Sequence, residues 1–173
     1  MRLFPPACAK MGKNIKEEVM KKEHWGYKKV GYKLATGTRF VTTTDLDTYC
    51  NTTGMREDIF LDDEAAKAVG AKIGQVPKGR IVPGAFQLAI VFALLRETGL
   101  IEEGVYLGTN NMKFNAMVYP YDRLKVEGKL LNRRVTSEGD RVIVTYSWFL
   151  KNQDDITMAQ GENICIFPNP KKP

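Results

Sequence analysis

Hydrophobic and polar residues alternate through the C-terminal half of the chain. The run that begins at Val142 reads VIVTYSWFL, and Val142, Val144, Tyr146 and Trp148 occupy every second position in it. A period of two is typical of a β-strand, and here it gives the strand one strongly apolar face and one mixed face. The run therefore predicts a strand that covers a core on one side.

Three further runs of this kind predict a sheet. Clusters of turn residues separate them at 120–122, 137–140 and 152–155, and such punctuation is typical of hairpins. The four predicted strands are Tyr106–Val118, Leu124–Val135, Val142–Leu150 and Ile156–Phe167. Strands joined in this way form an antiparallel sheet.

A different pattern precedes the strands. Residues 85–95 are apolar on nearly every side of a helix, Pro83 suits a first helical position, and Gly99 suits the end. They predict a helix of about 16 residues, roughly 24 Å long, and the apolar run is well short of the roughly 20 residues that cross a membrane. We therefore expect an α+β fold in which an antiparallel sheet wraps around a central buried helix.

Shorter helices are predicted nearer the N-terminus. Thr42 to Thr44 offer hydroxyl caps, Asp45 and Asp47 follow in the first turn, and Gly54 ends the segment. A second short helix is expected from Asp62 to Gly70.

The net charge changes the expected organisation of the chain. The protein has 173 residues and a formal charge of +6. Met1–Lys33 contains nine Lys or Arg residues and three acids, whereas the remainder contains seventeen of each. We therefore divide the chain into a basic N-terminal extension (1–36) with a helical candidate at Ile15–His24, one globular domain (37–168) and a short tail (169–173). The extension is expected to be a solvated face, and nucleic acid is not an expected partner.

Cysteine usage and the N-terminal sequence indicate the compartment. Cys8, Cys50 and Cys165 are widely spaced and odd in number, which predicts reduced thiols and neither a disulfide framework nor a metal site. No apolar stretch of signal-peptide length follows Arg2. We expect a cytoplasmic protein without a membrane span.

Three short phrases occur in a characteristic order. Thr53–Asp62 reads TGMREDIFLD and is followed by Glu64-Ala65-Ala66, Ile81–Phe86 reads IVPGAF, and Phe114–Leu124 reads FNAMVYPYDRL. In this order they resemble the MaoC-like enoyl-thioester hydratases and dehydratases of the hot-dog superfamily, over about Gly37–Phe167. The resemblance implies a hot-dog fold, an acyl thioester of the coenzyme A type as ligand or substrate, and no further cofactor.

Two positions depart from that family. The family carries an Asp and a His five residues apart, which activate water and move a proton. Met55 and Phe60 stand at these positions, and neither can carry a proton. The chain's one histidine, His24, lies outside the matching region and is expected to be exposed and incidental.

Other side chains offer substitutes for the missing pair. Asp58, beside Glu57, could hold a raised pKa, although adjacent residues of an extended chain point to opposite sides. Gln87 is the one polar residue within the apolar helical run. Asp58 and Gln87 are therefore the catalytic candidates, and the alternatives are a solvated or turn-capping role for Glu57 and Asp58 and a backbone hydrogen bond for Gln87.

Ligand binding could survive the loss of the pair. By resemblance, the amide near Gly84, after Pro83, would polarise a thioester carbonyl at the helix N-terminus, or Gly84 is needed only for close packing. Met55 and Phe60 would pack on an acyl chain or fill its place. Lys78 and Arg80, with Lys72, Arg133 and Arg134, are candidates for coenzyme phosphates.

Three functions remain open at this point. The first is an acyl-thioester-binding protein without its own pair, in a homodimer or in a heterodimer whose other hot-dog subunit supplies catalysis. The second is an active thioesterase or divergent hydratase that uses Asp58, Glu57 or Gln87. The third is a dimeric scaffold with a basic binding arm.

Overall fold

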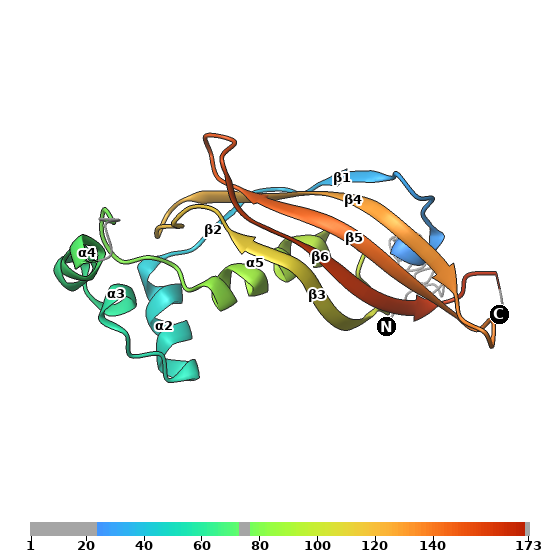
Figure 1. Ribbon diagram of the computed structural model, residues 1–173, viewed down its shortest axis with the longest axis horizontal. Helices are drawn as coiled ribbons and strands as arrows, with labels where there is room; N and C mark the ends of the chain where they lie inside the picture. The colour runs from blue at the N-terminus through green and yellow to red at the C-terminus, as the bar shows by residue number, and fades with distance from the viewer. Residues whose placement is uncertain (1–23, 73–76, 172–173) are drawn as a thin grey trace, which may run out of the picture.

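A single antiparallel sheet dominates the computed structural model, which describes residues 24–72 and 77–171 (Figure 1). In the described residues the path through the sheet is β1-β4-β5-β6-β3, and β2 also pairs with β4. The strands are β1 Lys33–Ala35, β2 Arg39–Phe40, β3 Val105–Phe114, β4 Arg123–Val135, β5 Arg141–Lys151 and β6 Thr157–Pro168. The four predicted strands are confirmed, although β3 ends four residues earlier than expected.

The alternation in β5 fixes which face of the sheet is buried. Val142, Val144, Tyr146 and Trp148 are fully buried, and the residues between them are partly exposed. The hairpin turns contain Gly139 and Asp155, both with positive φ, at 74° and 61°. Turn chemistry and strand periodicity therefore agree in this half of the chain.

β3 is an irregular edge strand. It pairs with β6 on one side, and the register shifts between Tyr106 and Gly108 and again between Asn110 and Lys113. Asn111, inside the second shift, has a φ of 52°. The other long edge is covered in part by β1 and β2.

The predicted central helix is α5, Gly84–Glu97, and it lies against one face of the sheet (Figure 1). We expected Pro83 to be the first residue of the helix. It is instead the N-cap, and the helix begins at Gly84. Ile90, Val91, Leu94 and Leu95 are buried in the core between helix and sheet. Ala85 and Ala89 are exposed, so the sheet covers only part of a helix whose sequence is apolar all round.

Three short helices form a lobe at one end of the sheet (Figure 1). They are α2 Thr43–Thr53, α3 Asp58–Leu61 and α4 Asp63–Lys72. As predicted, Thr42 caps α2 in a capping box with Asp45, and Gly54 ends it in the left-handed conformation. Gly70 does not stop α4, which continues to Lys72.

The described part of the N-terminal segment differs from the expected extension. Trp25 is fully buried, stacks on Tyr146 at 4.9 Å, and its amide donates to the carbonyl of Leu100. β1 then pairs with β4 as an edge strand. Residues 24–35 therefore belong to the core and the sheet. Burial of their aromatic residues on apolar surface favours this packing. The predicted helix Ile15–His24 lies, apart from His24, outside the described residues.

His24 is not exposed, as the sequence had led us to expect, but 4% accessible. Its ring stacks on Phe167 at 5.0 Å, and its Nδ1 accepts a hydrogen bond of 3.0 Å from the Gly26 amide. Burial lowers the pKa of His24, while Glu103 opposes that shift weakly from 3.9 Å. The neutral ring therefore anchors the start of the described chain.

This anchor predicts a pH dependence of stability. A lowered folded-state pKa means that the contribution of His24 is complete above its ordinary value of 6.5 and is lost as pH falls through the folded-state pKa. The expected result is a free energy of unfolding, measured by urea titration from pH 7.5 downward, that decreases below pH 6.5. His24→Asn keeps an acceptor for the Gly26 amide but does not titrate. It should show a smaller decrease, and equal slopes for both proteins would contradict the prediction.

Candidate functional site

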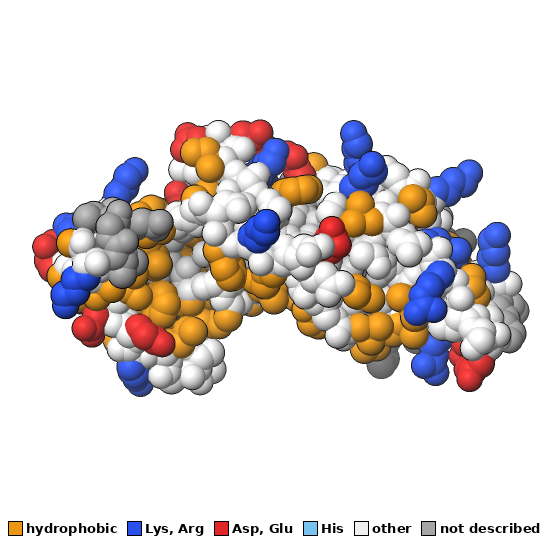
Figure 2. All heavy atoms as spheres, viewed as in Figure 1, with side chains coloured by type: hydrophobic (Ala, Val, Ile, Leu, Met, Phe, Trp, Pro, Cys, Tyr) orange, Lys and Arg blue, Asp and Glu red, His pale blue; other side chains and the backbone are white. Residues whose placement is uncertain are grey.

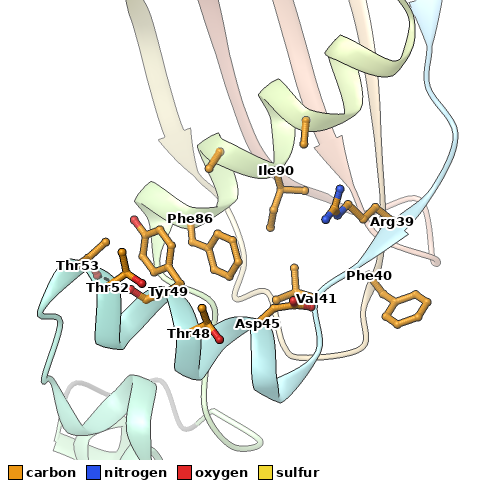
Figure 3. A pocket seen from close by; sticks show the side chains of 12 residues that line it. Arg39, Phe40, Val41, Asp45, Thr48, Tyr49, Thr52, Thr53, Phe86 and Ile90 are labelled. Atoms are coloured by element: carbon orange, nitrogen blue, oxygen red, sulfur yellow. Dashed lines mark hydrogen bonds between the residues drawn. The ribbon is translucent and has the colours of Figure 1, made fainter.

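An apolar groove lies between α2, α5 and the segment around β2. It encloses about 440 Å³. Figure 3 shows Phe86 and Ile90 pointing from α5 toward α2 across this space. The lining residues are Arg39, Phe40, Val41, Asp45, Thr48, Tyr49, Thr52, Thr53, Phe86, Ala89, Ile90 and Ala93.

Helical spacing explains how α5 forms the floor of the groove. Phe86, Ala89, Ile90 and Ala93 follow one another at intervals of three, one and three residues, so they share one stripe of the helix. Ala89 and Ala93 carry only a methyl group. The groove exists because small side chains stand where larger ones would fill the space between the helices.

Two stacked rings line the groove where α2 faces α5. Tyr49 of α2 and Phe86 of α5 lie nearly parallel, with ring centroids 4.3 Å apart and planes inclined by 5° (Figure 3). The two helices meet at these rings.

Two charged residues line the groove beside its apolar floor. Arg39 and Asp45 are both exposed. The amide and hydroxyl of Thr42 donate to the Asp45 carboxylate and hold its pKa below the ordinary value. Asp45 is thus committed to capping α2. The groove suits an apolar chain, each buried methylene of which contributes about 0.8 kcal/mol.

Met55 and Phe60 do not line this groove. Met55 follows the end of α2, Phe60 lies in α3, and both are partly exposed. Glu57 is the N-cap of α3 but makes no side-chain cap, and Asp58 is the first residue of that helix. Both acids are exposed, so the structure does not place either one in an enclosed pocket.

The start of α5 is covered by an aromatic ring. A Cβ on Gly84 would stand 2.5 to 2.9 Å from three ring atoms of Phe114, which is 52% exposed. Any larger residue at this position would have to displace the Phe114 ring, in line with the close-packing interpretation of Gly84. Pro83 provides no side-chain cap, so the first amides of α5 have no partner within the helix.

Gln87 makes the backbone hydrogen bond that we considered as an alternative to catalysis. Its Nε2 donates to the carbonyl of Val82 over 3.0 Å, and the residue is 4% accessible. Its Oε1 is buried without a hydrogen-bond partner in the described structure.

Arg80 joins the lobe to the loop before α5. Its guanidinium donates to Asp47 at 2.7 Å and lies 3.9 Å from Asp63, and its backbone amide donates to Asp63 at 2.7 Å. Arg80, which we considered as a ligand for coenzyme phosphates, is therefore already paired with two carboxylates. Arg80 and Lys78 do share a hollow of about 340 Å³, but Asp63 and Asp122 also line it.

The other phosphate candidates are dispersed. Lys72 ends α4 and is exposed, as is Arg134 near the end of β4. Arg133 donates through Nε to the carbonyl of Gly26 at 2.9 Å, which is a structural contact. These cations do not converge on the groove.

Residues 24–72 and 77–171 show how metal-ligating side chains, apolar helices and thiols are placed. In these ranges no group of three His, Cys, Asp or Glu side chains is placed to hold a metal ion. The helices found there are also too short or too polar to cross a membrane. Cys50 and Cys165 are buried free thiols, and burial raises the pKa of Cys165 to about 11. Cys8 lies outside the described residues.

The groove was missed by sequence reasoning. One signal was present, because α5 is apolar on more sides than one sheet can cover. Another element therefore had to pack against the side of α5 that the sheet leaves open. Tyr49 and Phe86 are the aromatic residues at which α2 meets that side. The family phrases drew attention instead to Met55 and Phe60.

Comparison with protein families identifies one match. A model described as "MaoC like domain" matches residues 28–150. No curated protein sequence matches the chain significantly.

Solved structures share the fold. A MaoC-like dehydratase from Rhodospirillum rubrum is 22% identical with a TM-score of 0.70, over 83% of this chain and 95% of that one. The R-hydratase PhaJ1 from Pseudomonas aeruginosa is 25% identical with a TM-score of 0.65, over 84% and 85%. The 3R-hydroxyacyl-ACP dehydratase complex HadBC from Mycobacterium tuberculosis is 13% identical with a TM-score of 0.61, over 80% and 98%. These likenesses confirm the predicted hot-dog fold.

The Arg80 contacts predict a structural role. Arg80→Ala should lower the free energy of unfolding by about 1 kcal/mol, because it removes the cation that pairs with the half-exposed Asp47 and Asp63 and the packing of its largely buried side chain. Lys78→Ala is the matched control, since Lys78 is exposed and only its backbone amide makes a recorded bond. Chemical denaturation of the two variants measures both effects, and equal stability would contradict the assignment.

Proposed function

Because the chain belongs to the MaoC-like domain family, we propose that it binds an acyl thioester of the coenzyme A type and acts with a hot-dog partner subunit that supplies the proton-transferring pair. The acyl chain occupies the groove between α2 and α5. The partner is a second hot-dog chain, and the complex works in the cytoplasm. This chain contributes binding surface and fold.

The groove is the observation that carries the proposal. It has an apolar floor of Phe86, Ala89, Ile90 and Ala93, it opens to solvent, and it lies one turn from the start of α5. A thioester carbonyl that displaces the half-exposed Phe114 ring from Gly84 would reach the first amides of α5 and extend its chain along the floor. Arg39 and Asp45 also line the groove, and the floor residues from α5 are all apolar.

Two features support a division of labour between subunits. Met55 and Phe60 stand where the family carries its Asp and His, so a hydration step needs groups from elsewhere. Within residues 24–72 and 77–171 no strand pairs with the outer edge of β3, and Val105, Leu107 and Phe114 there are each more than half exposed. HadBC, a complex of dehydratase subunits, has this fold.

Filling the groove should weaken ligand binding. Ala89→Leu places a branched side chain on the floor and should weaken binding of octanoyl-coenzyme A at least tenfold, measured by isothermal titration calorimetry. Ala35→Leu, at an exposed alanine of β1 outside the groove, is the matched control and should bind normally. Unchanged affinity in a folded Ala89→Leu protein would place the acyl chain elsewhere.

The purified chain alone should be catalytically silent. We expect no hydration of crotonyl-coenzyme A above background and no thiol release from a panel of acyl-coenzyme A esters, because the family's pair is absent. Hydration or thiol release that is lost on replacing Asp58, Glu57 or Gln87 by Ala would refute the division of labour and establish an active enzyme.

A further inference from the structure

Phe40 of β2 and Tyr121 of the turn before β4 form a pair of exposed aromatic rings beside the groove. Their ring centroids lie 6.5 Å apart with planes inclined by 35°, and the residues are 54% and 60% exposed. Figure 3 shows the Phe40 ring turned away from Phe86 and Ile90, toward the outside of the groove. Because two rings in solvent gain little from burial, folding alone does not account for the pair.

The backbone at Tyr121 makes a large side chain there more unusual. The Asp122 amide donates to the carbonyl of Tyr119 over 3.2 Å, and Tyr121 has a φ of 70°, so residues 119–122 have the features of a type II turn. The third position of this turn ordinarily holds glycine, because a side chain is strained at positive φ. A tyrosine at this position therefore points to a use for its ring.

The hydroxyl of Tyr121 does not supply that use. It lies 3.3 Å from Oγ1 of Thr43 in an exposed contact. Both hydroxyls could bond to water instead, so the net contribution of the contact to stability is small. The ring, and not the hydroxyl, is the part of the side chain that needs an explanation.

The aromatic pair stands between two hollows that each contain a cation. Phe40 and Arg39 line the groove, whereas Tyr121 and Lys78 line the hollow of about 340 Å³. Within residues 24–72 and 77–171, neither the Arg39 nor the Lys78 side chain forms an ion pair. The carboxylates in these hollows already accept hydrogen bonds from neighbouring donors; they belong to Asp45, Asp63 and Asp122. A ligand on the rings would thus have a cation on either side and the apolar groove beside it.

A purine base joined to phosphates and to an acylated arm matches these surroundings. We propose that Phe40 and Tyr121 form a clamp for the adenine ring of a coenzyme A thioester. Aromatic side chains stack on bases through their faces, and a ring between two others needs roughly 7 Å, twice the contact distance between carbon atoms. The observed 6.5 Å is close to that spacing. This inference rests on the proposed thioester binding and adds the carrier of the acyl group, since a thioester on a carrier protein has no adenine.

Calorimetric titration of the full chain with octanoyl-coenzyme A and octanoyl-phosphopantetheine tests the clamp, because only the first ligand carries adenine. The coenzyme A ester should bind about tenfold more tightly, as expected for one stacked base. Phe40→Leu and Tyr121→Gly should each remove most of that difference, with little change in the affinity for octanoyl-phosphopantetheine.

Three further measurements separate loss of the ring from loss of the fold. Tyr121→Gly should unfold at an equal or higher urea concentration than the unaltered protein, because glycine relieves the strain at positive φ. Tyr121→Phe restores the ring without the hydroxyl and should bind octanoyl-coenzyme A more tightly than Tyr121→Gly. Phe149→Leu, at an exposed aromatic residue of β5 outside both hollows, is the matched control and should bind both ligands normally.

The clamp and the proposed function fail in different ways. Equal affinities of the unaltered protein for the two ligands, or an unchanged preference in folded Phe40→Leu and Tyr121→Gly, would overturn the clamp alone. An equal loss of affinity for both ligands in these variants would assign the rings to the acyl arm and would also overturn it. Absence of binding by both ligands in the unaltered protein would overturn the proposed function together with the clamp.

Discussion

The structure depends on how an apolar helix is covered. α5 is apolar nearly all round, whereas the sheet lies against one side of it. Val91, Leu94 and Leu95 receive that cover and lie in the core, whereas Phe86, Ala89, Ile90 and Ala93 also face the groove. The α2 lobe covers part of the side of α5 that the sheet leaves open. The uncovered part of that side forms the groove. Fold and candidate site therefore arise from the same surplus of apolar surface.

Local rules predicted the elements well because each has a local cause. The capping box of Thr42 and Asp45, the left-handed Gly54 and the alternation in β5 all depend on residues near one another in the sequence. Residues 24–35 were mistaken for part of an extension because lysines outnumber aromatic residues in the sequence up to that point. Burial of Trp25 against Tyr146 is decided by a contact across 121 positions, which composition does not reveal.

The candidate site was predictable only in part. Pro83 and Gly84 do open the buried helix, but the ring on Gly84 comes from Phe114, thirty positions later. Arg80 was expected to meet phosphates, and two carboxylates of the lobe bind it instead. Gln87 stood out in the sequence as a polar residue among apolar neighbours. The structure adds that its Nε2 is hydrogen-bonded and its Oε1 is not. Figure 2 shows hydrophobic side chains gathered along the lower edge of this view, where the lobe meets the body.

The irregular edge of the sheet has a consequence for assembly in a crowded solution. A long regular edge strand accepts any extended chain and leads to aggregation. In β3 two shifts of register and the left-handed Asn111 break the ladder into short stretches. An arbitrary strand can match only one stretch at a time, whereas a surface shaped to the bends can match more than one. The bulges thus weaken non-specific pairing at this edge and favour partners whose shape matches it.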